Sequence, residues 1–266
     1  MSLWDYKEAF DEVVFCLENS KNKLLARYLK LKFFKKARHF QSFNLLEGKP
    51  LVQVIANGPS AKNFSINPSA QQIYMNFGFK HPTFAEAKDP VLCIVDEKLV
   101  NGGWPIEMIH EAYKINETVI FAFSIFFISS RHIRELTKNY DIFFTSNFLT
   151  ATRWSSRPLF SINKPSYGGG ATEQSLSLAV SLFYKHIDVY GYDGNNVILG
   201  LNATNTHFYG VDPSKDWSNP KFVARELRFL SYFIDKNVHL ARLMSARGVS
   251  VRLSDPSVFM TMFRSN

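Results

Sequence analysis

The sequence predicts an α/β fold of the Rossmann-like type, in which a mostly parallel sheet is covered by helices on both faces. Short runs rich in apolar and β-branched residues alternate along the chain with longer stretches of helical periodicity, and this alternation is typical of βαβ units. The 266 residues, 46% of them hydrophobic, also suffice for one sizeable core. We therefore expect an α/β domain over residues 49–266, preceded by a basic helical segment over residues 1–48.

The N-terminal segment differs from the rest of the chain in its charge. Residues 21–38 place lysines and arginines among leucines, a tyrosine and phenylalanines at helical spacing. One interpretation is peripheral contact with the inner face of an anionic membrane, where each basic residue near the surface contributes ~1 kcal/mol. The other is a helical hairpin that packs on the main domain with its lysines in water.

Seven candidate strands and four candidate helices make up the domain. The strands are expected at residues 51–56, 72–75, 91–95, 118–123, 142–145, 187–190 and 249–253. The helices are expected at residues 105–114, 127–138, 170–185 and 221–247, the last of which is followed by a glycine, a common stop signal. Residues 202–220 are rich in Asn, Thr, Asp, Ser and Pro and are expected to form a long irregular loop, of a kind that often binds substrates.

Composition indicates in which cellular compartment the protein is expected and which classes of partner it could bind. The formal charge of +8 suits phosphate-bearing partners or anionic membranes, but no recognition motif accompanies it, so no nucleic acid is expected. Cys16 and Cys93 lie in apolar surroundings without metal-ligand spacing, which favours reduced thiols in a cytoplasmic protein. No signal-peptide pattern is visible, and the most apolar segment, residues 119–128, is shorter than the ~20 residues that span a bilayer. Assembly into a homo-oligomer stays open.

The first candidate binding turn is Asn57-Gly58-Pro59-Ser60, which directly follows the strand expected at residues 51–56. Ligands of α/β proteins bind at the carboxyl ends of the strands, where Gly58 would permit a sharp turn and the close approach of a ligand. Ser60 can cap the following segment or donate a hydrogen bond to a phosphate. The alternative is a strand-to-loop turn that binds no ligand.

Two further turns are expected at the same edge of the sheet. Gly168, Gly169 and Gly170 open a helix, so that uncovered N–H groups and the positive end of the helix dipole can meet a phosphate. The strand at residues 187–190 runs into Gly191-Tyr192-Asp193, which would project Asp193 at the same edge of the sheet as Asn57. The alternatives are tight helix packing for the glycines and a turn-forming role for Asp193.

The candidate general base is His207, which lies in the polar loop together with Tyr209. A histidine with a pKa near neutrality can accept a proton from a hydroxyl group, and Tyr209 could donate a hydrogen bond to the developing charge on a phosphate. The alternative is an inert loop histidine.

Taken in order, these motifs resemble the bacterial sialyltransferases of glycosyltransferase family 42. The order is residues 56–60, Met75-Asn76, the glycine-rich helix start, residues 189–193, residues 207–210 and residues 251–256. The resemblance runs from about residue 51 to residue 263, and the shared order of short motifs carries it. The Asn-Gly-Pro-Ser turn also occurs in flagellin-glycosylation and pterin-diphosphokinase-like proteins.

The resemblance implies a CMP-activated donor, sialic acid or a related 2-keto sugar acid, and neither a metal ion nor another cofactor. Asn57 and Ser60, with Gly58 between them, would lie along the nucleotide phosphate and ribose, and Asn76 would contact the cytidine or the sugar. Residues 168–170 match the family's short Ser-Gly turn at the donor, with glycine in place of its serine.

The remaining family positions concern the base and the leaving group. Asp193 would hold the ribose or the cytosine edge, and His207 matches the histidine that deprotonates the acceptor hydroxyl. The family's two phosphate-binding tyrosines have no clear counterparts after Asp193, so Tyr192 or Tyr209 would substitute for them. We therefore predict an inverting, metal-independent transfer to a surface glycan such as lipopolysaccharide or capsule.

Two other classes of function stay open. In a Mg-dependent enzyme of the pterin-diphosphokinase type, the glycine-rich turn would bind ATP, and Asp193 with Asp188 or Asp96 would hold Mg²⁺. In a non-catalytic, membrane-associated scaffold, no nucleotide would raise the melting temperature of the protein.

Overall fold

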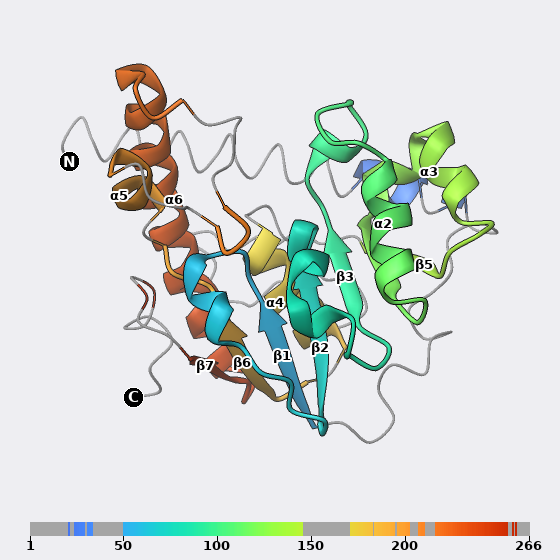
Figure 1. Cartoon of the computed structure of the whole chain (residues 1–266), viewed down its shortest axis with the longest axis horizontal. Helices are drawn as coiled ribbons and strands as arrows, with labels where there is room; N and C mark the ends of the chain where they lie inside the picture. The colour runs from blue at the N-terminus through green and yellow to red at the C-terminus, as the bar shows by residue number, and fades with distance from the viewer. Residues whose placement is uncertain are drawn as a thin grey trace.

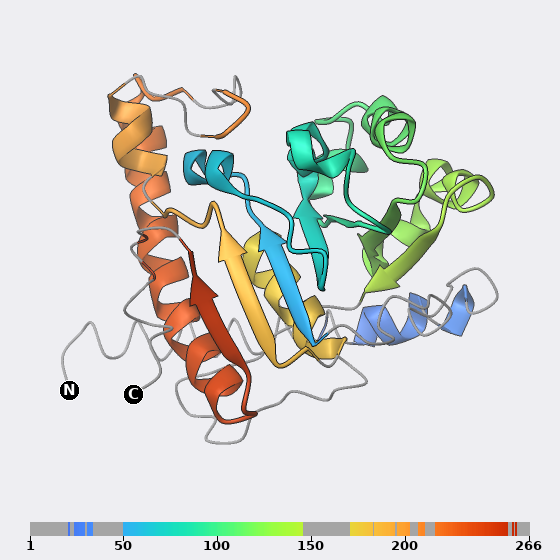
Figure 2. The same cartoon turned by 60° about the horizontal axis from the view of Figure 1, so that its bottom comes forward.

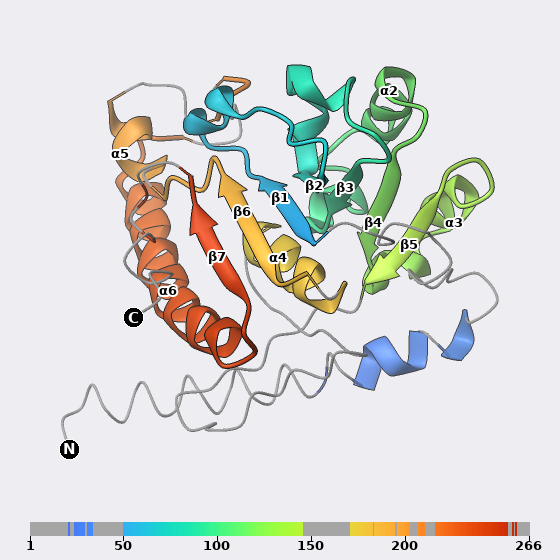
Figure 3. The same cartoon turned by 90° about the horizontal axis from the view of Figure 1, so that it is seen from below.

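The protein is built on one seven-stranded sheet (Figure 1). The computed structural model describes residues 21, 24–29, 31–33, 50–145, 171–182, 184–194, 196–202, 207–210, 216–254, 257 and 259. The strands are β1 (Leu51–Ile55), β2 (Ala70–Met75), β3 (Val91–Ile94), β4 (Ile120–Ser124), β5 (Ile142–Thr145), β6 (His186–Tyr190) and β7 (Ser250–Leu253). Every pairing among them is parallel, and the order across the sheet is β5-β4-β3-β2-β1-β6-β7 (Figure 3). The predicted Rossmann-like class is confirmed.

Helices cover both faces of the sheet. One face packs against α4 (Ala171–Ser181) and α6 (Pro220–Ser245), and the other against α2 (Glu107–Ile115) and α3 (Arg131–Leu136). Most strand positions are apolar because side chains that point to either face are covered, whereas the edge strand β7 is partly exposed. In β1, for example, Val52 and Val54 belong to the first core and Ile55 to the second, and all three are fully buried.

The chain reverses direction across the sheet between β1 and β6. It proceeds outward from β1 to β5, then returns through α4, which packs under β1, β2 and β3, to place β6 on the other side of β1. Such a point is the switch point of an open α/β sheet, and ligands bind in the crevice outside the carboxyl ends of the two strands that flank it. In this protein those ends are followed by residues 56–60 and 191–193, two of the predicted binding turns.

The predicted helices agree with the structure in three places out of four. The helices expected at residues 105–114, 170–185 and 221–247 correspond to α2, α4 and α6, but the single helix expected at residues 127–138 is wrong. The chain there forms a 3₁₀ helix, η6 (Ile125–Ser129), and then α3, and Ser130 between them is extended with ψ 130°. The aromatic and β-branched side chains of η6 are buried in the core, and their packing overrides the helical period.

Short helices occupy the ends of the strands. Those that follow β1, β2 and β3 are η2 (Pro59–Asn63), η3 (Asn76–Lys80), η4 (Pro82–Phe84) and η5 (Glu97–Leu99), and α5 (Asn196–Leu201) follows β6. Of the loop expected at residues 202–220, the described residues 207–210 and 216–219 are indeed turns and irregular structure.

The described part of the N-terminal segment packs on the domain. Within helical residues 24–29, Ala26 and Leu29 are buried against Ile125 and Ile128 of η6, as the second interpretation of this segment expected. The guanidinium of Arg134 also lies over the Phe33 ring, 5.2 Å from its centroid. Within the ranges given above, no helix has both the length and the apolar character needed to cross a bilayer.

Candidate functional site

The turns that follow β1 and β6 are joined at the switch point. The amide of Ala56 donates to the carbonyl of Tyr190 at 2.8 Å, and the amide of Gly58 donates to the carbonyl of Gly191 at 2.9 Å. A Cβ atom on Gly58 would lie 2.4 Å from the Gly191 carbonyl oxygen, and one on Gly191, whose φ is +67°, would lie 2.7 Å from the Ala56 oxygen. Both glycines are therefore required for the two turns to approach each other so closely.

The carboxylate of Asp193 is bound by the first turn. Its Oδ2 accepts a hydrogen bond from the amide of Ser60 at 3.1 Å, and its Oδ1 accepts one from the Ser60 hydroxyl. Asp193 is buried, and its Oδ2 lies only 2.5 Å from the position that a Cβ of Gly58 would take. The sequence placed Asp193 and Ser60 in the same site, and the structure brings them into direct contact with each other.

Two asparagines at the ends of neighbouring strands have buried amide oxygens without a hydrogen-bond donor in the described part of the chain. They are Asn57, two residues after the end of β1, and Asn76, directly after β2. Asn76 adopts a left-handed conformation, with φ 49°, which only a few per cent of non-glycine residues do. A buried acceptor without a donor costs about 1–3 kcal/mol, so a ligand hydroxyl or amine that donates to either oxygen would recover that energy.

His207 reaches this edge through its loop. The amide of Phe208 donates to the carbonyl of Asn57 at 3.0 Å, and a bridge between His207 and Gly210 closes the loop. The ring of His207 is half-buried and stacks on that of Tyr209, with centroids 5.0 Å apart and an interplanar angle of 15°. Figure 2 shows residues 207–210, in orange, at the edge toward which the strand arrows point. The turns that carry Asn57, Ser60 and Asp193 and the loop that carries His207 thus lie at the same edge of the sheet, as the sequence predicted.

Tyr192 takes part in a different cluster. Its hydroxyl donates a hydrogen bond to the carboxylate of Glu173 and accepts one from Asn237 Nδ2 at 2.7 Å. Its ring stacks on that of Phe259, with centroids 4.3 Å apart. Asn237 Nδ2 also donates to Glu173 Oε1 at 3.0 Å. We call Glu173, Tyr192 and Asn237 the buried polar triad. Its members come from the first turn of α4, the turn after β6 and the middle of α6.

The glycine-rich turn, Gly168 to Gly170, lies outside the described residues. It directly precedes Ala171, the first residue of α4, and the first turn of α4 contacts the β6 turn through Glu173 and Tyr192. The start of α4 is thus at the same edge of the sheet as Asn57 and Asp193. The sequence analysis did not single out Glu173 or Asn237, although a polar residue at a buried position of a long helix is a recognisable signal.

An aromatic cluster extends from His207 along the edge of the sheet. Tyr209 contacts Phe77 of η3 with ring centroids 5.8 Å apart, and Phe77 contacts Trp104 at 4.9 Å. All three rings are half-buried. We call Phe77, Trp104 and Tyr209 the aromatic platform. Phe77 and Trp104 were not predicted, because single aromatic residues in short 3₁₀ helices and loops have no periodic signal.

The acidic residues that a metal ion would need have other roles. Asp188 forms a bidentate ion pair with Arg252 across β6 and β7, with N–O distances of 2.9 and 2.7 Å, and this carboxylate raises the pKa of Arg252 above its ordinary value. Asp96 caps η5 by accepting from the amide of Lys98 at 2.9 Å. Nowhere in the described ranges do three or more His, Cys, Asp or Glu side chains gather closely enough to hold a metal ion.

Comparison with known proteins gives one distant structural similarity. A scan against models of protein families finds no match, and a search of curated proteins finds no relative. Among solved structures, the chain is similar to the sialyltransferase CstII from Campylobacter jejuni in complex with a substrate analogue, cytidine-5′-monophosphate. The two share 12% sequence identity with a TM-score of 0.42, over 82% of this chain and 87% of that chain.

Proposed function

We propose that this protein is an inverting glycosyltransferase that uses a CMP-activated 2-keto sugar acid, such as sialic acid, as its donor. One observation carries the proposal: the turn after β1, the turn after β6 and the His207 loop meet at the switch point, joined by the bonds Gly58–Gly191, Ser60–Asp193 and Phe208–Asn57. Ligands of open α/β sheets bind at this position. The order of the sequence motifs, which resembles that of glycosyltransferase family 42, supports CMP as the nucleotide and a glycan as the acceptor.

The donor is proposed to lie between the β1 turn and the start of α4. The amide oxygens of Asn57 and Asn76, for which the described residues supply no donor, can accept hydrogen bonds from ribose or sugar hydroxyls. The N–H groups of residues 168–170, at the N-terminal end of α4, would face the phosphate. Asp193 then acts as a positioning residue, because its carboxylate holds Ser60 and thereby the turn that carries Asn57.

The chemistry needs a base on the acceptor side and hydrogen-bond donors on the leaving group. His207 takes the proton of the acceptor hydroxyl while its oxygen forms a bond to the anomeric carbon. The bond from that carbon to the phosphate oxygen breaks, and its electron pair leaves with CMP. Attack from the side opposite to CMP inverts the configuration of the anomeric carbon. A monophosphate is a good leaving group with less charge than a diphosphate, so the proposed reaction needs no metal ion.

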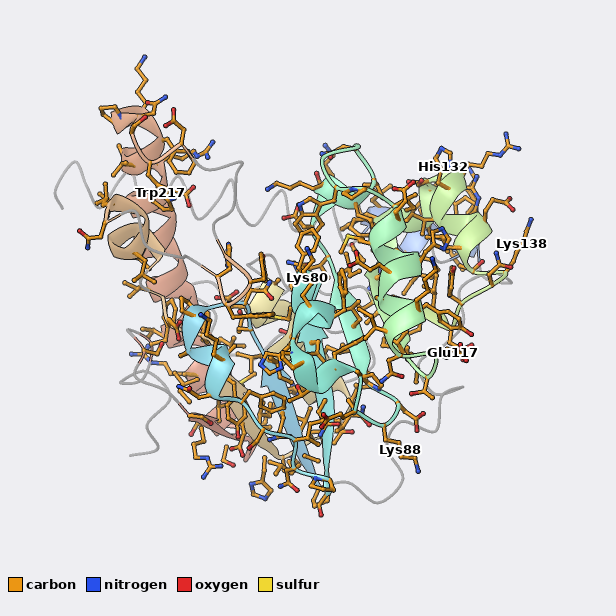
Figure 4. All side chains as sticks on the ribbon, viewed as in Figure 1. Lys80, Lys88, Glu117, His132, Lys138 and Trp217 are labelled. Carbon is orange, nitrogen blue, oxygen red and sulfur yellow. The ribbon has the colours of Figure 1, made fainter. Side chains whose placement is uncertain are left out.

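Replacement of His207 by alanine tests the proposal. The His207→Ala variant should lose about 10²–10⁴-fold in turnover of a CMP-linked donor, because a positioned general base contributes that much, while its affinity for CMP stays near that of the wild type. His132→Ala is the matched control, since His132 is exposed on α3 (Figure 4). Unchanged turnover in His207→Ala, or no binding of CMP by the wild type, would refute the assignment.

The magnesium-dependent alternative is less well supported by the contacts at this edge. Asp193 already accepts hydrogen bonds from Ser60, Asp188 is paired with Arg252 and Asp96 accepts from the amide of Lys98, so Mg²⁺ would have to compete with each of these partners. The scaffold alternative has no such geometric objection, and the same CMP-binding measurement distinguishes it from an enzyme.

We also propose that the helical residues near the N-terminus contact an anionic membrane, which would bring the enzyme to a lipid-linked glycan such as lipopolysaccharide or to capsule. The face opposite Ala26 and Leu29 exposes Leu24, Leu25, Tyr28 and Leu31, with Lys21, Arg27 and Lys32 also exposed. Apolar and basic side chains together favour such a surface. Sedimentation with vesicles should show binding to phosphatidylglycerol but not to phosphatidylcholine alone, and Leu31→Asp should abolish it. Equal binding of this variant would contradict the proposal.

A further inference from the structure

The aromatic platform presents two lysine ammonium groups that have no acidic partner in the described part of the chain. The Nζ of Lys80 lies 5.2 Å from the centroid of the Phe77 ring and 6.0 Å from that of Tyr209. The Nζ of Lys98 lies 5.7 Å from the centroid of Trp104. The ion pairs found among the described residues involve neither lysine. Among the described residues, the only groups found in contact with these two ammonium groups are the faces of aromatic rings.

The platform borders the catalytic side of the site. Tyr209 stacks on His207 at 5.0 Å and contacts Phe77, which in turn contacts Trp104. A hydroxyl that gives its proton to His207 must lie within hydrogen-bond distance of that imidazole, so the sugar ring carrying it would lie beside Tyr209. The turns around Gly58 and Gly191, where the donor is proposed to bind, are joined to the His207 loop by the bond from the Phe208 amide to the Asn57 carbonyl. The platform therefore extends from the proposed base, next to the position that the acceptor hydroxyl must take.

From this arrangement we infer that the aromatic platform, with Lys80 and Lys98, is the acceptor subsite and that it selects a glycan carrying a negatively charged group. The inference rests on the proposed function. Half-buried aromatic rings stack on the apolar faces of sugars, and the two ammonium groups would pair with a carboxylate, sulfate or phosphate of the acceptor. An uncharged acceptor would use the rings and leave both lysines without an anion.

A glycan array tests the inference. Binding of the wild type is measured, with CMP present, to neutral glycans and to their sulfated, phosphorylated, uronic-acid and sialylated counterparts. Anionic glycans should be preferred. The Lys80→Ala/Lys98→Ala variant should lose this preference, and Phe77→Ala and Trp104→Leu should weaken binding about five- to tenfold. Lys88→Ala is the matched control, because Lys88 is exposed at the opposite end of the sheet (Figure 4).

The affinity of the same variants for CMP distinguishes failure of this inference from failure of the proposed function. The inference predicts that the affinity for CMP is unchanged in all of them, which also shows that they are folded. Weaker CMP binding by Phe77→Ala or Trp104→Leu would overturn it, since the rings would then hold the nucleotide base. Equal binding of neutral and anionic glycans would also overturn the inference, and so would the absence of binding to either class of glycan. If the wild type binds anionic glycans through Lys80 and Lys98 but does not bind CMP, the proposed function fails and the anionic subsite stands.

Discussion

Gly58 is the residue on which the geometry of the site depends most directly. Its own backbone angles, φ −65° and ψ 159°, suit any amino acid, so conformational freedom is not the reason for glycine here. The reason is space, because a Cβ would lie 2.4 Å from the Gly191 oxygen and 2.5 Å from Asp193 Oδ2. The neighbours that exclude a side chain are thus the second turn and its carboxylate.

Gly58→Ala should therefore lower the free energy of unfolding by about 1–3 kcal/mol, as other overpacked substitutions do, and should weaken CMP binding. Urea unfolding and calorimetric titration with CMP measure the two effects. Gly103→Ala is the control, since a Cβ there would meet only side-chain atoms, those of Lys98 and Asn101, at 3.1–3.3 Å. Equal stability of the Gly58 and Gly103 variants would contradict the close approach of the two turns.

His81 makes the stability of the domain depend on pH. Its Nε2 donates to the carbonyl of Ala61 at 2.9 Å, and its Nδ1 accepts from the amide of Thr83 at 3.3 Å, so the neutral ring is satisfied. Burial lowers the pKa of His81 below its ordinary value of 6.5. As the pH falls through 6.5, the unfolded chain takes up a proton that the folded protein still excludes, so stability is lost.

The free energy of unfolding should accordingly reach its full value above about pH 6.5 and fall by at most about 1.4 kcal/mol per pH unit below it, on account of this one group. Urea titrations at pH 7.5, 6.5 and 5.5 on the wild type and on His81→Gln isolate the effect, because the other groups titrate in both. The variant should show the shallower dependence. Identical slopes would mean that His81 does not resist protonation.

At the scale of elements, the buried polar triad joins α4, α6 and the turn after β6. Glu173 is 2% exposed, and a buried carboxylate is tolerated only when hydrogen bonds compensate its lost hydration. Tyr192 and Asn237 supply such bonds. The triad therefore holds the start of α4 against the turn that carries Asp193.

Tyr192→Phe should lower the free energy of unfolding by about 1–3 kcal/mol, because it removes a donor to the buried Glu173 carboxylate while keeping the ring that stacks on Phe259. Chemical denaturation measures this loss. Tyr113→Phe serves as the control, since Tyr113 on α2 is half-buried like Tyr192, but no hydrogen bond of its hydroxyl is found among the described residues. A negligible effect at Tyr192 would show that the triad does not stabilise this junction.

For the whole molecule, the proposed function predicts stabilisation by one nucleotide. Binding to the folded state alone raises stability by mass action, so CMP at ~100 times its dissociation constant should add ~2.7 kcal/mol. Thermal-shift measurements with CMP, UDP, GDP and ATP, each with Mg²⁺ or EDTA, should show the effect for CMP and no dependence on the metal. A shift with ATP that disappears in EDTA would favour the magnesium-dependent alternative.

Much of this architecture could be read from the sequence because it depends on local pattern. The seven strands are short apolar runs bounded by turn residues, and the turns after residues 55 and 190 can be recognised as strand ends from the same pattern. The helix at residues 127–138 was misjudged because its apolar residues have a helical period while their burial imposes a different conformation.

By itself, the amino-acid sequence determined the fold class and the edge of the sheet at which Asn57, Asp193 and His207 meet, because strand periodicity and turn residues are encoded by near neighbours. Only the tertiary structure decided what each side chain contacts. In it, Asp193 accepts hydrogen bonds from Ser60, and the Tyr192 hydroxyl forms hydrogen bonds with Glu173 and Asn237. Phe77, Trp104 and Tyr209 contact one another in a row, and the ammonium groups of Lys80 and Lys98 lie over their rings. These contacts join residues far apart in the chain, and strand order and packing, which no local pattern specifies, bring them together.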